Sequence, residues 1–328
     1  MKEKLVKYAK KFLPLVGIII LIYLIIKLDV EKIKDALLSI KPTYVLLSLS
    51  LTVPALLVRN YGWQLIQKEQ KIKLGFFQSL RIFLIGSFYS IVTPGFLGNI
   101  MRVPYMKEKT GDPYGKLFVN ITIEVILRTL AVFLLMLVGA FLVIGKFSQV
   151  FFIVLIVFII YSLIMLYFIE KKRGEKFFNV LIKYFIPTKL RGDSYNFVNT
   201  FYSDFPKVNR LILPLILGIL TWVIVLSQGY IIVLALGVSI PYFYFLLLYP
   251  IAYVAGYLPI TIAGLGLREL TAVLLFSTLF GTSKAEILVI ALLGFIITDV
   301  VVGFIGFIIC LTEARDNPEK KKELLRFQ

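Results

Sequence analysis

Histidine is absent from this sequence of 328 residues, and cysteine occurs once, as Cys310. Without an imidazole, the chain cannot carry histidine acid–base catalysis, a Ser-His-Asp triad or the common histidine sites for transition metals. A single cysteine excludes an internal disulfide and a thiolate metal cluster. The chain also lacks the GxxxxGK[ST] loop that binds nucleotide phosphates. We therefore expect no metal, no cofactor and no enzymatic activity.

Hydrophobic residues, in contrast, make up 59% of the chain, whereas soluble domains average about 45–50%. They form long continuous runs, and no segment between the runs is large enough for a catalytic domain. At about 20 residues per membrane span, this composition predicts an all-α polytopic membrane protein with about 6–8 transmembrane helices. The apolar runs cover residues 12–26, 44–58, 76–100, 117–144, 150–169, 211–236, 242–259, 265–280 and 287–311.

The formal net charge is +17, with 36 basic and 19 acidic residues. In a soluble protein this excess would suggest nucleic acid as a partner. Here the cations lie in short loops between apolar runs, where they orient the chain and attract anionic lipid head groups. We expect a multi-pass protein of the cell membrane with cytoplasmic N- and C-termini, membrane lipids as partners and no nucleic acid.

The distribution of basic loops predicts two re-entrant hairpins. The loops at residues 59–81, 102–116 and 170–210 are all basic, so all three favour the cytoplasm. The run at 76–100 can then enter and leave on the same side, and its glycines and Pro94 supply turn residues at membrane depth. A second hairpin at 242–280, entering from outside, completes the topology. An amphipathic helix is expected within the third loop, at residues 177–185.

This topology gives each half of the chain the order span, hairpin, span, with opposite orientation, which is an inverted-topology repeat. We predict one integral membrane domain over residues 1–328, divided into an N-terminal helix and linker (1–42), a first repeat (43–145), a connecting helix and basic cytoplasmic loop (146–210), a second repeat (211–312) and a charged cytoplasmic tail (313–328).

The two hairpin tips are the candidate substrate site. Irregular backbone at membrane depth is tolerated only where it is buried in protein or lines a cavity. Thr93 followed by Pro94 is typical of a helix start, and a half-helix N-terminus binds anions. Alternatively, the two arginines near the tips mark helix ends and extend to the interface. The candidate residues are Thr93, Pro94, Gly95, Gly98, Arg102, Thr261, Gly264, Gly266, Arg268 and Glu269.

Three further charged residues lie inside apolar runs. Glu124 and Arg128 are four residues apart, on one face of a helix, and form either an internal ion pair or part of a polar pathway for coupling. Asp299 has no oppositely charged neighbour in its own run, so its partner would be Arg128 or Arg268. The two tryptophans, Trp63 and Trp222, are expected to anchor helices at the membrane interface.

The chain resembles the flippase-like membrane domain of lysylphosphatidylglycerol synthase, the bacterial multiple peptide resistance factor, and its stand-alone relatives. The resemblance covers nearly the whole chain. It rests on Trp63-Gln-Leu-Ile, on Ser90-Ile-Val-Thr-Pro-Gly-Phe-Leu-Gly98 with Arg102, on the Glu124 helix, and on Leu258-Pro-Ile-Thr-Ile-Ala-Gly-Leu-Gly-Leu-Arg-Glu269. The chain departs from the family at Glu124. Family members often have Glu-Arg there, with Asp three residues beyond that Arg, whereas in this chain Glu124 is followed by Val125 and the next arginine is Arg128.

The resemblance implies a lipid translocase that moves an anionic or phosphate-containing lipid, or a lipid-linked head group, between leaflets. Its phosphate would lie against Arg102 and Arg268 while one repeat rocks against the other. An aminoacyl-transfer domain is not recognisable in these 328 residues, so lipid synthesis is not expected. The alternative is a non-transporting membrane partner that presents lipid to a separate glycosyl- or aminoacyl-transferase. Nothing resembles an ion selectivity filter.

Overall fold

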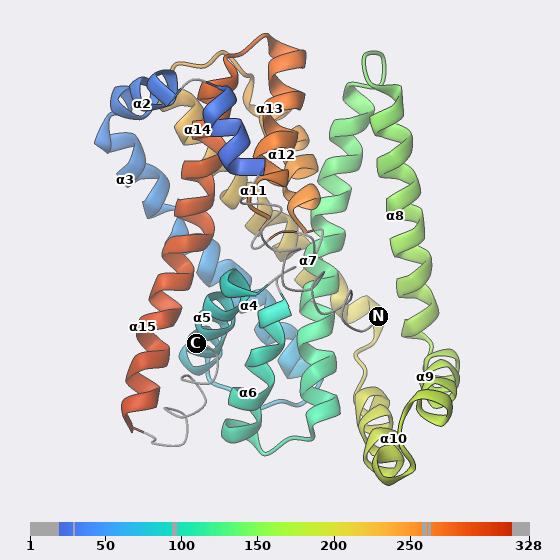
Figure 1. Cartoon of the computed structure of the whole chain (residues 1–328). Coiled ribbons are helices and arrows are strands. Elements are labelled where there is room, and N and C mark those ends of the chain that lie inside the picture. Colours follow the sequence, from blue (N-terminus) through green and yellow to red (C-terminus); the bar gives the residue numbers. More distant parts are fainter. Residues whose placement is uncertain (1–19, 29, 94–96, 258–260, 262–263, 317–328) are drawn as a thin grey trace, which may run out of the picture. The chain divides into compact units, whose positions relative to one another are not determined.

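A computed structural model describes residues 20–28, 30–93, 97–257, 261 and 264–316, and every regular element in them is a helix (Figure 1). Five helical stretches are long and apolar enough to cross a membrane, which confirms an all-α polytopic membrane protein. They are Pro42–Glu69, Tyr114–Leu142, Ser148–Ile169, Val208–Ala235 and Lys284–Glu313.

The helices belong to two compact units. Unit 1 comprises the described residues within Met1–Leu57, Leu80–Met101 and Val223–Gln328, and unit 2 those within Val58–Ser79 and Arg102–Trp222. Each unit therefore takes residues from both predicted repeats. The predicted first span at residues 12–26 lies largely outside the described residues, which are helical from residue 20 to residue 27.

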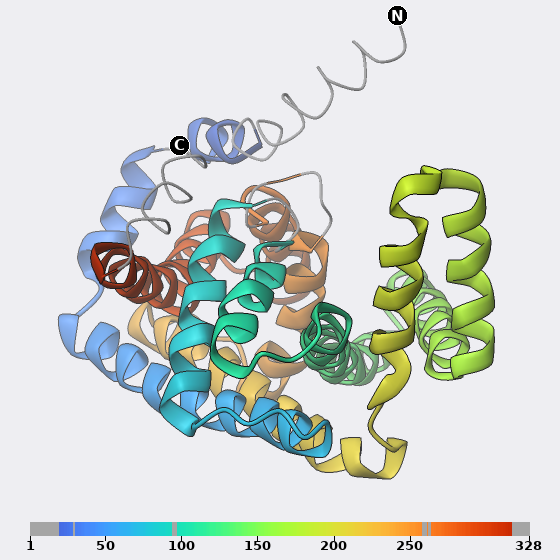
Figure 2. The same cartoon turned by 90° about the horizontal axis from the view of Figure 1, so that it is seen from below.

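Unit 2 is built around α7, a helix of 29 residues. This helix packs against α8 and α10, and the short helices α9 and α10 form a hairpin beside them (Figure 2). The buried residues Ile66, Val119, Ile123, Leu127 and Leu211 form part of its core. Its elements are most of α4 (Thr52–Glu69), α6 (Arg102–Thr110), α7 (Tyr114–Leu142), α8 (Ser148–Ile169), α9 (Lys171–Phe185), α10 (Thr188–Ser203), η2 (Val208–Leu211) and the first half of α11 (Ile212–Ala235).

Unit 1 contains the other helices. Within it, α12 packs against α13, α13 against α14, and α2 against α14. A π-helical turn joins α14 to α15, so this helix runs continuously from Lys284 to Asp316. The elements are α2 (Val30–Ser39), α3 (Pro42–Ser50), α5 (Phe76–Val92), η1 (Leu97–Met101), α12 (Tyr242–Gly256), α13 (Leu267–Phe280), α14 (Lys284–Phe295), η3 (Ile296–Val300) and α15 (Val301–Asp316).

The turn between α12 and α13 depends on two glycines. Gly264 has φ +77°, in the left-handed region, and a Cβ on it would lie 2.8 Å from the Cα of Gly256. A side chain at residue 264 would therefore collide with the end of α12 as well as strain the backbone. The glycine pair lets the chain reverse direction and brings α13 back along α12.

The chain also folds back after α5. The hydroxyl of Thr93 donates to the carbonyl oxygen of Tyr89 at 2.9 Å and accepts from the backbone N–H of Gly98 at 2.7 Å. Thr93 thus closes the end of α5, and the next described helical turn begins at Leu97. The predicted start of a half-helix at Pro94 lies outside the described residues, because residues 94–96 are not described.

Two predictions about the loops need correction. The predicted basic loop at residues 59–81 is largely helical, because α4 continues to Glu69 and α5 begins at Phe76. The loop at 170–210 contains the expected amphipathic helix, which ends at Phe185 as predicted but begins at Lys171, and a second helix, α10, that the sequence did not predict. Buried Ile182, Val198 and Tyr202 pack these two helices together.

Candidate functional site

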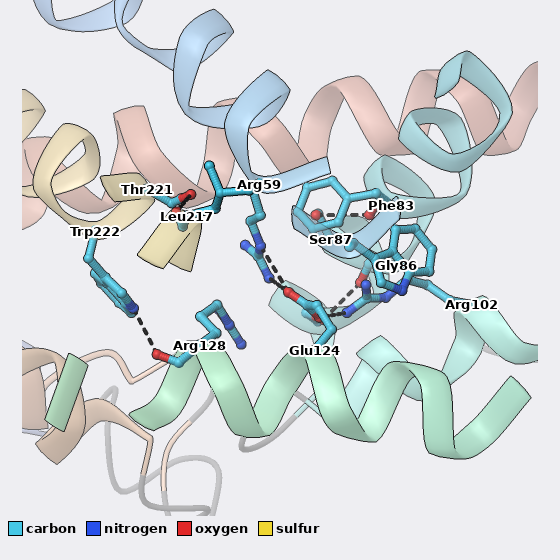
Figure 3. A network of polar contacts seen from close by, with 12 residues as sticks. Arg59, Phe83, Gly86, Ser87, Arg102, Glu124, Arg128, Leu217, Thr221 and Trp222 are labelled. Carbon is cyan, nitrogen blue, oxygen red and sulfur yellow. Dashed lines mark hydrogen bonds and ion pairs between the residues drawn. The ribbon is translucent and has the colours of Figure 1, made fainter. Parts of the chain in front are cut away.

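A charged cluster in unit 2 joins three helices through the carboxylate of Glu124 (Figure 3). From α4, Arg59 donates to Oε1 of Glu124 through Nε at 3.2 Å and Nη2 at 3.1 Å. From α6, Arg102 donates to Oε2 through Nη2 at 2.9 Å. Both oxygens of one carboxylate on α7 are thus used by two arginines that lie far from it in sequence.

Arg102 is completely buried, at 0% exposure, and its guanidinium lies 4.9 Å from the centroid of the Trp63 ring. A buried arginine is tolerated when a carboxylate and an aromatic face compensate for its lost hydration. Arg102 was predicted to bind a substrate phosphate, and the structure places it on Glu124.

A small cavity lies beside this cluster. It measures about 30 Å³, enough for about one water molecule, and Arg59, Glu124 and Arg128 supply its charged lining, with apolar residues and Thr221 around them. With Arg102 behind Glu124, three arginines meet one glutamate, a formal excess of two positive charges. Glu124 and Arg128, which were predicted to be neighbours, both line this cationic pocket from α7.

A stripe of side chains with polar groups runs along α4 and continues one residue past its end, to Gln70. Asn60, Trp63 and Gln67 recur at spacings of three and four residues, so they lie on one face of α4, and Gln70 follows at the same spacing; all four are buried. The indole N–H of Trp63 donates to Oδ1 of Asn120 at 2.8 Å, and Asn120 donates in turn to Gln70 at 2.8 Å. This α4 polar face is held inside unit 2 by α7.

Neither tryptophan is an interface anchor, so that prediction is wrong. Trp63 is 1% exposed and Trp222 5% exposed. The indole N–H of Trp222 donates to the backbone carbonyl of Arg128 at 3.0 Å (Figure 3). Both rings instead pack α4 and α11 against α7, each with its N–H bonded to that helix.

Unit 1 contains a second buried ion pair, at the start of α13. Nε of Arg268 donates to Oε1 of Glu269 at 3.0 Å, and the other oxygen of Glu269 accepts from the backbone N–H of Gly266. The guanidinium of Arg268 also lies 4.3 Å from the ring centroid of Phe295 and 5.8 Å from that of Tyr253. Arg268, like Arg102, is therefore neutralised by a glutamate and covered by aromatic rings.

Asp299 lies in the π-helical turn that joins α14 to α15. Its Oδ2 is 2.8 Å from the hydroxyl of Thr298, which is itself 3.2 Å from the hydroxyl of Tyr253. Because Arg268 lies over the ring of Tyr253, these residues connect Asp299 to the Arg268–Glu269 pair. A π-helical turn inside an α-helix is frequent at functional sites.

The structure describes some of the residues predicted at the hairpin tips but not others. Pro94 and Gly95 lie outside the described residues, whereas Gly98 and Gly264 contact the ends of α5 and α12. Thr261 is 0% exposed, and its hydroxyl has no hydrogen-bond partner in the described part of the chain. Within the same described residues, no group of three carboxylate or cysteine side chains could hold a metal ion.

A model of the lysylphosphatidylglycerol synthase TM region matches residues 12–306 of the chain. This chain belongs to the lysylphosphatidylglycerol synthase TM-region family. A UPF0104 membrane protein of Methanocaldococcus jannaschii is 24% identical to it over 340 residues, an alignment that covers 98% of this chain and 99% of that protein. The resemblance identified from the sequence is thereby confirmed, and the chain is a multi-pass membrane domain of a family associated with lipid modification and translocation.

The region that matches the family model contains both charged clusters, the one around Glu124 and the one around Arg268. Sequence reasoning identified Glu124 with Arg128 as neighbours on one helix and Arg102 apart from them, but it missed Arg59, which it assigned to a loop. It also missed Asn120, whose side chain links Trp63 to Gln70. The three- and four-residue spacing of the α4 polar face was the signal that could have extended the helix past Val58.

Proposed function

We propose that this protein is a lipid translocase and that it moves an anionic, phosphate-containing lipid head group between the two leaflets. The proposal rests on one observation above all, the arginine-rich pocket around Glu124. Charges at membrane depth are costly and usually mark substrate or ion pathways. Three arginines around one carboxylate leave positive charge that a phosphate would neutralise through paired N–H donors.

In the conformation described, the pocket holds about 30 Å³, which is far too small for a lipid head group. Translocation therefore requires the walls to separate, and the alternating exposure of transporter sites provides such a motion. We propose that Arg59 and Arg128 contact the phosphate first. Arg102, whose side chain is buried on Glu124, positions that carboxylate.

The second charged cluster is proposed to couple transport to a cation or proton. Around Arg268 there are two carboxylates, those of Glu269 and Asp299, so this cluster has one negative charge in excess. Asp299 is only partly buried, whereas Glu269 is fully buried. Asp299 is therefore the residue that we assign to proton or cation exchange.

The topology that accompanies this proposal has two re-entrant hairpins within an inverted repeat, and both termini in the cytoplasm. Two helix lengths support it. α5 has 17 residues and α12 has 15, each shorter than the roughly 20 residues of a full span. We propose no enzymatic activity and no nucleic-acid partner.

The test is reconstitution of the purified protein in vesicles with a fluorescent phosphatidylglycerol and a membrane-impermeant quencher. Wild-type protein should make the inner-leaflet label accessible, and Arg59→Gln and Arg128→Gln should each slow this at least tenfold. Such a loss corresponds to about 1.4 kcal/mol of lost stabilisation. Lys68→Gln, at the exposed end of α4, is the matched control and should retain the wild-type rate.

Arg102→Ala and Arg268→Ala are measured in the same assay, with folding checked by size-exclusion chromatography. Full activity in folded Arg59→Gln/Arg128→Gln protein would overturn the phosphate role. No lipid movement in pure vesicles, together with recovery of a glycosyl- or aminoacyl-transferase in pulldowns, would instead support the role of a lipid-presenting partner.

A further inference from the structure

Unit 2 contains a larger cavity that the proposed translocation does not use. It measures about 290 Å³ and lies between α7 and α8, and Phe178 of α9 and Phe201 of α10 also line it. Figure 2 shows these four helices grouped together. The lining residues that matter below are Phe118, Thr122 and Ile126 of α7 and Tyr161, Met165 and Ile169 of α8, and the lining ends at Phe205 and Leu211 after α10.

The lining is hydrocarbon almost throughout. Only Thr122 and Tyr161 bring polar side-chain atoms to it, and both hydroxyls already donate to backbone carbonyls of α7, those of Phe118 at 2.8 Å and Ile126 at 3.1 Å. A buried water needs two to four polar partners, and apolar cavities of about 150 Å³ stay dry and bind hydrocarbon ligands instead. The cavity is therefore suited to an alkyl chain rather than to water.

The cavity and the arginine pocket lie on different faces of α7, and Leu127 lines both. Phe118, Thr122 and Ile126 recur every four residues and face the cavity. Glu124 and Arg128 lie on the other face of the helix, in the lining of the arginine pocket. A ligand of the apolar cavity would therefore not occupy the proposed translocation site.

The chain adds positive charge where the lining residues end. Lys207 comes two residues after Phe205, and Arg210 directly precedes Leu211. Lys171 comes two residues after Ile169, and its ammonium already pairs with Glu175 at 3.6 Å. All three cations are exposed. Cations next to a membrane-embedded apolar site favour the anionic head group of a lipid.

We propose that this cavity binds one hydrocarbon chain of an anionic lipid whose head group lies against Lys207 and Arg210. The bound lipid would fill the space between α7 and α8 and fix the α9–α10 hairpin against them. This inference does not depend on translocation, because the site would be occupied whether or not the protein moves lipid.

The test uses phosphatidylglycerol with a photoactivatable group in its acyl chain, added to vesicles that contain the whole protein, with adducts mapped by mass spectrometry. Adducts are expected on lining residues of α7 and α8, and unlabelled phosphatidylglycerol should compete for them saturably. Met165→Trp fills the cavity and should lower these adducts roughly tenfold, the cost of displacing about two methylene groups. Leu166→Trp, on a neighbouring residue that is 60% exposed, is the control and should leave them unchanged.

The head group is tested separately with Lys207→Gln/Arg210→Gln, which should lower labelling about fivefold for each charge removed. Equal labelling by a phosphatidylcholine analogue would overturn the anionic preference. Adducts spread evenly over the exposed face of α8, without saturation in wild-type protein, would overturn the cavity site itself. The competition in wild-type protein decides this even if Met165→Trp does not fold.

Discussion

Arg102 and Glu124 form an ion pair between α6 and α7 in which the arginine is 0% and the glutamate 6% exposed at the side chain. Removing one partner of a buried pair leaves the other charge uncompensated, which costs far more than the pair itself contributes. Arg59 shares the same carboxylate at 3.1 Å. The fold of unit 2 therefore depends on Glu124 more strongly than on either arginine.

We predict that Glu124→Gln lowers the free energy of unfolding by about 3–5 kcal/mol, because two buried or half-buried guanidinium groups lose their counter-charge. Denaturant unfolding in detergent micelles, followed by circular dichroism, measures this. The matched control is Glu31→Gln on α2, whose side chain is 78% exposed in a 4.0 Å pair with Lys34, and it should change stability by less than about 0.5 kcal/mol. Glu124→Gln with wild-type stability would show that the ion pairs are not structural.

Alanine substitutions at two glycines separate backbone strain from steric collision in the α12–α13 turn. Gly264 and Gly237 both have positive φ, +77° and +66°, but only Gly264 has a neighbour within 4 Å of a built Cβ. Alanine at either residue costs about 1–2 kcal/mol of backbone strain, and Gly264→Ala adds about 1–3 kcal/mol from the collision with Gly256. Thermal unfolding should therefore show a larger loss for Gly264→Ala. Equal losses would mean that the glycine contact is not needed.

The helical elements follow the hydrophobic runs closely, because each continuous apolar run is a strong local signal for a helix. The run at residues 150–169 corresponds to α8, and the run at 211–236 to α11. The prediction was wrong about the end of α4. The apolar run stops at Val58, whereas the helix continues to Glu69. Polar Asn60, Gln64 and Gln67 lower the hydropathy there. The structure buries Asn60 and Gln67, and the three amides donate to Phe76, Leu74 and Ser79, at and just before the start of α5.

The site was predicted residue by residue but not as an arrangement. Membrane-depth charges are rare enough that Glu124, Arg128 and Asp299 are found by inspection. Which of them pair is decided by helix packing, and that information is absent from spacing within a single helix. Arg102 and Glu124 are 22 residues apart, and Arg59 and Glu124 are 65 residues apart. Patterns within a single helix cannot predict contacts between residues so far apart in the sequence.

The burial of both tryptophans can be tested by fluorescence. Since the sequence contains two tryptophans, Trp63→Phe and Trp222→Phe each leave a single emitter. Both remaining indoles should resist quenching by brominated lipids and by acrylamide, because Trp63 is 1% and Trp222 5% exposed. Leu166→Trp in a Trp63→Phe/Trp222→Phe background provides a lipid-exposed reference that should be strongly quenched. Quenching of either native tryptophan to the same extent would contradict its burial.

The α9–α10 hairpin should lose stability at high pH through Tyr202, whose hydroxyl donates to the carbonyl oxygen of Phe168 at 3.0 Å. Burial, aided by the charge of Glu175, raises the pKa of this phenol from 10.0 to about 12. The protonated phenol is thus favoured in the folded state, so its contribution is complete below pH 10 and declines as pH rises through the folded pKa.

Tyr202→Phe removes both the hydrogen bond and the titrating group. At pH 8 we expect this variant to be about 1 kcal/mol less stable than wild type. Because the phenylalanine does not ionise, the difference should shrink between pH 10 and pH 12, the interval over which wild type loses the Tyr202 contribution. Unfolding midpoints in detergent at several pH values measure it, with Tyr184→Phe, at a residue that is 71% exposed, as the control that keeps Tyr202 and its pH dependence. If the stability difference between wild type and Tyr202→Phe stays constant up to pH 12, ionisation of Tyr202 does not destabilise the fold.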